Sequence, residues 1–136
     1  MNAPPPTLPI RTECPPGACV CDRDALLQDP QADTRVLLLT REEEKRLLQR
    51  LEQITSLADL RRLQDRMEQQ LGIRLTIAPG PNEVRTLRGI TILVHEQRGL
   101  CRKTRQSIPA AIRQALELRP EISYELLDEG GLFGRQ

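Results

Sequence analysis

Three of the four cysteines of this 136-residue chain fall within one short stretch. Cys14, Cys19 and Cys21 lie in "CPPGACVC", and Cys101 follows far along the chain in "RGLCRKTRQ". Thiolates bind soft metals, and four of them complete a tetrahedral zinc site or hold an iron–sulfur cluster. The sequence therefore predicts a metal centre formed by Cys14, Cys19, Cys21 and Cys101.

The spacing of the first three cysteines is C-x4-C-x-C, which differs from the paired knuckles of most structural zinc sites. The portion C-x-x-G-x-C, residues 14–19, resembles the cluster-binding loop of plant-type ferredoxins. That loop has two residues before its third cysteine, whereas Val20 alone stands here. The resemblance implies a [2Fe–2S] cluster, with Gly17 letting backbone N–H groups turn toward sulfur. We expect an iron–sulfur cluster, [2Fe–2S] before other types, or zinc.

The neighbours of two cysteines favour the thiolate form. Cys21 precedes Asp22, the predicted N-cap of a short helix, and Cys101 stands among basic residues. A helix dipole and nearby positive charges both lower the pKa of a thiol. If Cys21 and Cys101 meet without metal, they could form a reversible disulfide, and the protein would be a thiol redox switch. The remaining interpretation is inert thiols, with Cys101 a small buried apolar residue.

The basic segment 98–113 is a second candidate site. Between Glu96 and Arg113, five basic side chains face one acidic side chain, a local charge of +4. The side chains predicted to bind nucleic acid or another anion are Arg98, Arg102, Lys103 and Arg105. With almost no aromatic residues to stack on bases, any nucleic acid would be held by its phosphate backbone. An acidic protein partner and a merely solvated surface are the alternatives.

Catalytic and targeting patterns are missing from the sequence. His95 is the only histidine, so hydrolytic triads are unsupported, and no phosphate-binding glycine loop precedes a helix. We expect a non-catalytic accessory protein whose partner is another protein. The formal charge of +1 gives no general attraction to nucleic acid. Without a secretory signal or a long apolar run, a cytoplasmic location and no membrane partner are expected.

The elements that position these residues must enclose an aliphatic core, because only Tyr124 and Phe133 are aromatic. Periodicity and capping residues predict a helix over 23–29, a buried strand over 35–40, helices over 40–54 and 56–71, an antiparallel pair of strands within 73–78 and 83–96, a helix from Ser107 to 119 and a last helix over 121–129. This order predicts an α+β fold, a small antiparallel or mixed sheet covered by a helical hairpin and one or two C-terminal helices. Residues 1–13 should form a flexible Pro-rich arm, and residues 14–136 a single domain that begins with the cysteine-rich loop.

Overall fold

The computed structural model describes residues 10–11, 14, 19–79 and 89–129. These residues form an α+β fold with a two-stranded antiparallel sheet, as predicted. In chain order the elements are α1 (Arg23–Gln28), the 3-10 helix η1 (Arg35–Leu38), α2 (Arg41–Glu52), α3 (Leu57–Leu71), β1 (Leu75–Pro79), β2 (Ile90–Val94), α4 (Arg102–Leu118) and α5 (Pro120–Glu129). Within this part of the chain, every helix is too short or too polar to cross a bilayer.

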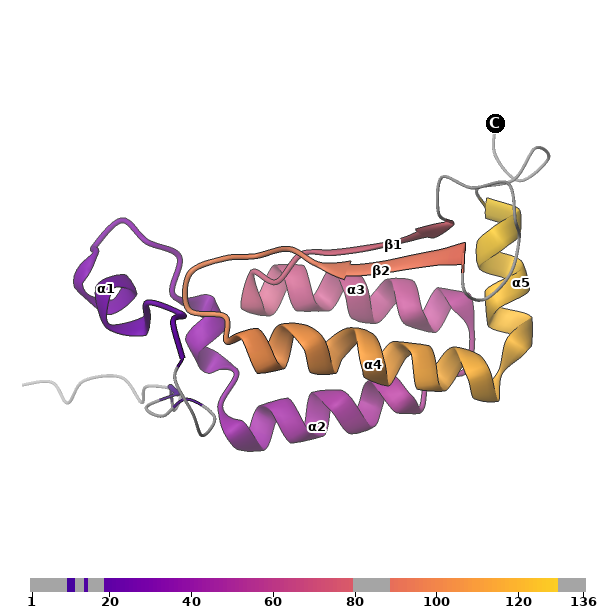
Figure 1. Ribbon diagram of the computed structural model, residues 1–136, viewed down its shortest axis with the longest axis horizontal. Coiled ribbons are helices and arrows are strands. Elements are labelled where there is room, and N and C mark those ends of the chain that lie inside the picture. Colours follow the sequence, from indigo (N-terminus) through magenta and orange to yellow (C-terminus); the bar gives the residue numbers. More distant parts are fainter. Residues whose placement is uncertain (1–9, 12–13, 15–18, 80–88, 130–136) are drawn as a thin grey trace, which may run out of the picture.

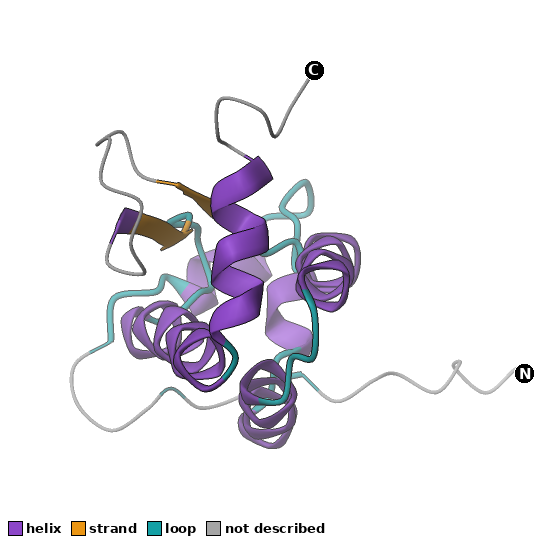
Figure 2. Cartoon of the chain, turned by 90° about the vertical axis from the view of Figure 1, so that its right-hand side faces the viewer, coloured by secondary structure: helices purple, strands orange, loops and turns teal. Residues whose placement is uncertain are grey.

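The helices and the sheet form stacked layers. The sheet runs along one side of α3 and α4, and α2 packs against α4 on the side away from the strands (Figure 1). Helix α5 stands across the far ends of these helices, as the end-on view also shows (Figure 2). Helix α1 lies at the opposite end of the molecule, which is the end where α4 begins (Figure 1).

The predicted helical hairpin is confirmed, and its caps are the predicted ones. The Thr40 hydroxyl accepts a hydrogen bond from the Glu43 N–H at 3.3 Å, and the Ser56 hydroxyl accepts one from the Asp59 N–H at 3.0 Å. Both bonds satisfy a backbone donor that a helix start leaves free. Gly72 ends α3 in the left-handed conformation with a φ of 70°, where glycine is favoured.

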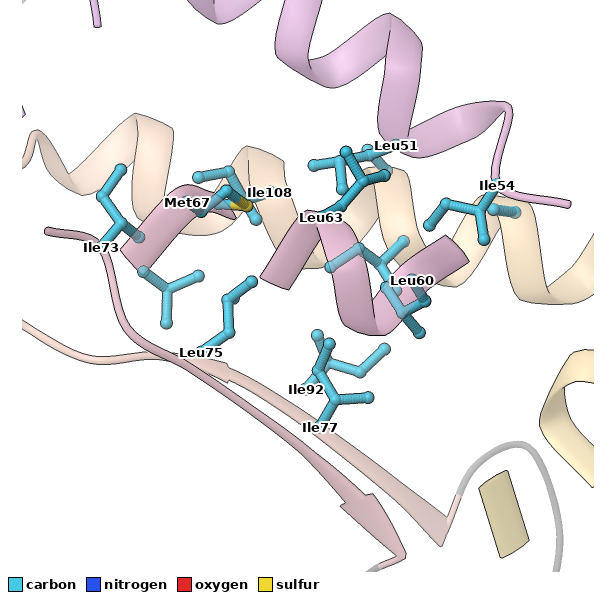
Figure 3. Close-up of a cluster of buried hydrophobic side chains, with 14 of the residues drawn as sticks. Leu51, Ile54, Leu60, Leu63, Met67, Ile73, Leu75, Ile77, Ile92 and Ile108 are labelled. Carbon is cyan, nitrogen blue, oxygen red and sulfur yellow. The ribbon is translucent and has the colours of Figure 1, made fainter. Parts of the chain in front are cut away.

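Aliphatic side chains from the helices and one face of the sheet fill the core. Strand β1 pairs with β2 in the register Leu75↔Val94 and Ile77↔Ile92, and these four side chains are buried. They pack against buried leucine, isoleucine and methionine side chains of the helices (Figure 3). This contiguous cluster of described residues contains no cysteine, although Cys21 and Cys101 are also buried.

The strand predicted over 35–40 is wrong, because this segment forms η1. The N–H of Leu37 bonds to the carbonyl of Thr34 at 3.0 Å, and that of Leu39 to Val36 at 3.1 Å, which is the i to i+3 pattern of a 3-10 helix. A short apolar run reads the same whether it is a buried strand or a buried helical turn. Val36 and Leu37 are fully buried, as the apolar run predicts, but no strand lies beside them in the described chain.

The predicted start of the long C-terminal helix at Ser107 is also wrong. Helix α4 begins at Arg102, with Cys101 as its N-cap, and Pro109 lies inside it. The Ser107 hydroxyl donates a hydrogen bond to the carbonyl of Lys103 at 2.8 Å instead of capping a helix. The earlier start places Cys101 at the first turn of α4. The last helix is confirmed as α5, with Pro120 as its first residue.

Three predictions fall wholly or partly on residues outside the described ranges. They concern most of the arm over 1–13, the turn after residue 79 and the stop at Gly130. Two residues of the predicted arm are described. Ile10 is exposed, and Arg11 is buried with 7% of its surface accessible.

Candidate metal centre

The four cysteines reach one point from two distant parts of the chain. Cys101 is the N-cap residue of α4 and is almost fully buried, with 1% of its surface exposed. Cys14, Cys19 and Cys21 approach it from the segment that leads into α1. Cys21 is buried, and Cys14 and Cys19 are half-buried.

A backbone hydrogen bond holds the two segments together, because the N–H of Gly99 donates to the carbonyl of Cys21 at 2.6 Å. A second one, from the N–H of Arg11 to the carbonyl of Leu37 at 2.7 Å, ties the chain before Cys14 to η1. Gly99 has a φ of 85°, and a Cβ atom there would lie 2.6 Å from Leu26 Cδ2. Only glycine fits this position, because both the backbone conformation and the close contact exclude a side chain.

The sulfur atoms of the four cysteines all lie within 4.8 Å of one another, and all four cysteines are free. Cys14 Sγ and Cys21 Sγ are 3.6 Å apart. In a tetrahedral zinc site with Zn–S bonds of about 2.3 Å, neighbouring sulfurs are about 3.8 Å apart. The arrangement is therefore compatible with metal binding by Cys14, Cys19, Cys21 and Cys101.

Burial has a large effect on the acidity of these thiols. Burial raises the pKa of Cys101 well above its ordinary value, and the positive charge of Arg11 offsets only part of that rise. Burial also raises the pKa of Cys14, together with hydrogen bonds to Cys21 and Cys19. Burial acts in the same direction on Cys19, but hydrogen bonds from the Cys21 backbone and the other thiols outweigh it and lower the pKa.

The expectation that basic neighbours lower the pKa of Cys101 is therefore wrong, because the sulfur is desolvated. Such a thiol gives up its proton when a metal ion takes the proton's place.

Two arginines that the sequence did not single out contact the cysteine cluster. Arg11 Nη2 donates a hydrogen bond to the carbonyl of Gly99 and lies 3.7 Å from Cys21 Sγ. Arg23 Nη1 lies 3.9 Å from Cys14 Sγ. Both arginines are close to the cysteines in sequence, at three residues before Cys14 and two after Cys21. That proximity was the only signal for them, and it is weak because a tenth or more of the chain is basic.

Comparison of the chain with protein-family models, with curated proteins and with solved structures gives no match. The chemistry of the centre therefore follows from its own side chains. Four thiols, two guanidinium groups and the N-terminus of a long helix meet at one point. Such a site can hold a soft cation and offset the negative charge of its thiolates.

The predicted anion-binding residues divide into two groups. Arg98, Arg102 and Arg105 line a cavity that also borders Cys21, whereas Lys103 is exposed and is not among its lining residues. Arg113 lies farther along α4 and donates a hydrogen bond to the carbonyl of Ile90 at 3.0 Å. Of the basic segment 98–113, only the part around the first turn of α4 lies near the cysteines.

His95 lies apart from this cluster at the end of the sheet. Its Nε2 atom and the Thr76 hydroxyl are 2.7 Å apart. This contact fits the structural role expected of a lone histidine, and the cysteine cluster found among the described residues does not include it.

Proposed function

We propose that the protein binds one zinc ion through the thiolates of Cys14, Cys19, Cys21 and Cys101. The observation that carries the proposal is the mutual approach of all four sulfurs to within 4.8 Å. Four protein ligands complete the tetrahedral coordination of a zinc ion and leave no coordination position for a substrate. The centre is then structural, and it ties the segment before α1 to the first turn of α4.

The compactness of the sulfur cluster favours a single ion over the [2Fe–2S] cluster expected from the ferredoxin resemblance. In a dinuclear cluster, two irons and their bridging sulfides separate the two pairs of cysteine sulfurs. Those pairs lie farther apart than the ligands of a single ion. Gly17, which carries much of the ferredoxin resemblance, lies outside the described residues. Among single ions, zinc is the usual occupant of a closed site of four cysteines.

The test is the metal content of protein purified without air or chelator. We expect one zinc per chain and neither iron nor acid-labile sulfide. Cys14→Ser and Cys101→Ser should each lose most of the zinc. The first removes a ligand from the segment before α1, and the second removes the ligand at the start of α4. His95→Asn is the control, since it removes the only histidine and should leave the zinc content unchanged. Iron with sulfide would replace the zinc proposal with a cluster, and metal-free protein would reject both.

The same proximity favours a second candidate, a thiol redox switch. All four thiols are free and near one another, so an added oxidant such as diamide could take two electrons and two protons from Cys21 and Cys101 to form a disulfide. Mass spectrometry after alkylation should then show that pair linked in oxidised protein. If all four thiols of the metal-free protein can still be alkylated after treatment with the oxidant, no disulfide has formed and the switch is excluded.

A further inference from the structure

A cavity of about 280 Å³ lies beside the cysteine cluster, between the segment before α1 and the start of α4. The residues lining it are Val20, Cys21, Asp22, Glu96, Gln97, Arg98, Leu100, Arg102 and Arg105. This volume is large enough for a small molecule. Its walls come from both segments that the proposed zinc ion joins.

Three arginines give this cavity a positive wall. Arg98 is paired with Asp29 at 3.5 Å, and Arg105 with Glu96 at 3.4 Å. Both contacts are long, and each pair includes an exposed side chain, although Arg105 itself is half-buried. Such pairs contribute little energy. They leave most guanidinium donors of these arginines free for another anion. Arg102 is exposed and forms no ion pair within the described residues.

Arg102, which lines this cavity, is also the first residue of α4. Within the described chain, the N–H groups of residues 102–104 make no hydrogen bond, and the side chain of Cys101 does not cap them. Free N–H groups at the start of a 17-residue helix favour an anion, most strongly a phosphate. Arginine adds to this preference, because its planar fork matches two phosphate oxygens.

The rest of the lining indicates the size and kind of ligand. Leu100 and Val20 provide apolar surface for a small organic part, and Val20 is 84% exposed at the edge. Asp22 and Glu96 bring negative charge, so the arginine and carboxylate side chains of the lining together carry a net charge of only +1. Asp22 should therefore weaken the binding of any anion, which gives a direct test.

We infer that this cavity binds the phosphate group of a small phosphorylated molecule, with Arg98, Arg102 and Arg105 as its ligands. The inference goes beyond the metal centre and does not require it. A nucleic-acid strand is less well suited, because among the described residues Tyr124 is the only aromatic side chain and it lies on α5, at the other end of the molecule (Figure 1). The organic part would rest on Leu100 and Val20.

Titration calorimetry of the full chain with glycerol 3-phosphate tests the inference, with glycerol as the phosphate-free probe. We expect saturable binding at one site, competition by inorganic phosphate and no binding of glycerol. Arg102→Gln should weaken binding about tenfold, since it removes a charge-assisted hydrogen bond. Lys103→Gln is the matched control, with the same loss of charge on the next residue, and should change affinity by less than about twofold because solvent screens it.

Asp22→Asn provides a test in the opposite direction. Asparagine tolerates the left-handed conformation of this residue, whose φ is 60°, so the fold should be kept. Removing its negative charge should tighten binding about threefold.

Absence of saturable phosphate binding by folded protein would overturn the inference. So would equal losses in Arg102→Gln and Lys103→Gln, or binding of a single-stranded oligonucleotide without binding of glycerol 3-phosphate. The zinc content of each sample is measured separately, so failure of the metal proposal remains distinguishable.

Discussion

The guanidinium of Arg11 is buried beside sulfur atoms and has no carboxylate partner in the described part of the chain. Its Nε atom makes no hydrogen bond there, and 7% of the residue is exposed. A buried positive charge costs several kcal/mol of free energy unless an opposite charge lies near it. Four thiolates around a divalent ion carry a net charge of −2 and would supply that opposite charge. Arg11 and the centre should therefore stabilise each other.

Arg11→Met should lower the affinity for zinc about 10- to 100-fold, the range found for groups that support metal ligands. Methionine keeps much of the side-chain volume but removes the charge. Zinc affinity can be measured by competition with a chromophoric chelator. Arg46→Met is the control, because Arg46 forms an exposed ion pair with Glu43 on α2. Equal affinities for the two variants would show that Arg11 does not act on the centre.

Gly99 joins the two segments of the centre, and its replacement should be costly. In Gly99→Ala the new methyl group would lie 2.6 Å from Leu26 Cδ2 and 2.7 Å from Val36 Cγ1. We expect a loss of about 2 to 4 kcal/mol in the free energy of unfolding, from the strained φ and the overpacking together. Urea denaturation measures this loss.

Gly72→Ala is the matched control for Gly99→Ala. Its φ of 70° is similar, but the nearest atom to the new methyl group is the end of the exposed Asp33 side chain. That side chain can move, so the loss in the free energy of unfolding should stay near the backbone strain alone, about 1 to 2 kcal/mol. A larger loss at Gly72 than at Gly99 would contradict this account of the junction.

At the scale of elements, one buried carboxylate fixes the junction of α2 and α3. Asp59 is 2% exposed and accepts hydrogen bonds from Arg50 Nη2 at 2.5 Å and from the Thr55 N–H at 3.1 Å. The hydrogen bond from Arg50 is the largest influence, and it lowers the pKa of Asp59 from 3.8 to about 2. The charged form of Asp59 therefore stabilises the fold.

This stabilisation should depend on pH in a defined range. Because the folded pKa lies below the unfolded one, the contribution is complete above pH 4 and is lost as the pH falls toward 2. Its size is roughly 1 to 2 kcal/mol, since Arg50 is partly exposed to solvent. The difference in unfolding free energy between the wild type and Asp59→Asn should shrink over that range. A difference that stays constant from pH 5 to pH 2 would show that the Asp59 charge is unimportant.

Local signals in the sequence predicted the helical hairpin and the sheet. Thr40 and Ser56 act through hydrogen bonds within a few residues, and Gly72 acts through its own φ, so their effects can be read without the fold. The segment 35–40 was misassigned because its burial is set by distant elements and not by its own pattern. The start of α4 was predicted too far along the chain because its N-cap is a cysteine, which is not among the residues that favour this position.

The cysteine cluster could be predicted as a group but not as a geometry. Clustering in a Pro/Gly-rich stretch identified Cys14, Cys19 and Cys21, whereas the approach of Cys101 depends on where α4 begins. The cavity and the contacts of Arg11 depend on how distant segments pack together. Neither could be found from spacing alone.

At the scale of the whole molecule, the cysteine centre lies at the edge of the aliphatic core, where Leu100 of the core cluster adjoins Cys101. The centre lies at the end of the molecule that holds α1 and the start of α4, while the core fills the space between the helices and the sheet (Figures 1 and 3). Cys21 and Cys101 are buried, but the contiguous aliphatic cluster of the described residues includes no cysteine, so most of the fold should survive without metal. This differs from small zinc fingers, which unfold when the metal is removed.

Removal of zinc by a chelator should leave the far-UV circular dichroism nearly unchanged. The melting temperature should fall by several degrees, because zinc that binds only the folded state stabilises it by mass action. Proteolysis of the metal-free protein should begin between residues 10 and 22, where the centre holds the chain. A collapse of the helical signal on chelation would show instead that the metal supports the whole fold.

X-ray absorption at the zinc edge tests the central claim most directly, because it counts the ligands and measures their distances. For zinc-loaded wild-type protein, the account predicts four sulfur neighbours at about 2.3 Å and no second metal nearby. Cys101→Ser should show three sulfurs and one lighter atom if it retains zinc. A wild-type spectrum with nitrogen or oxygen ligands in place of sulfur, or with a metal–metal distance, would contradict a single ion held by Cys14, Cys19, Cys21 and Cys101.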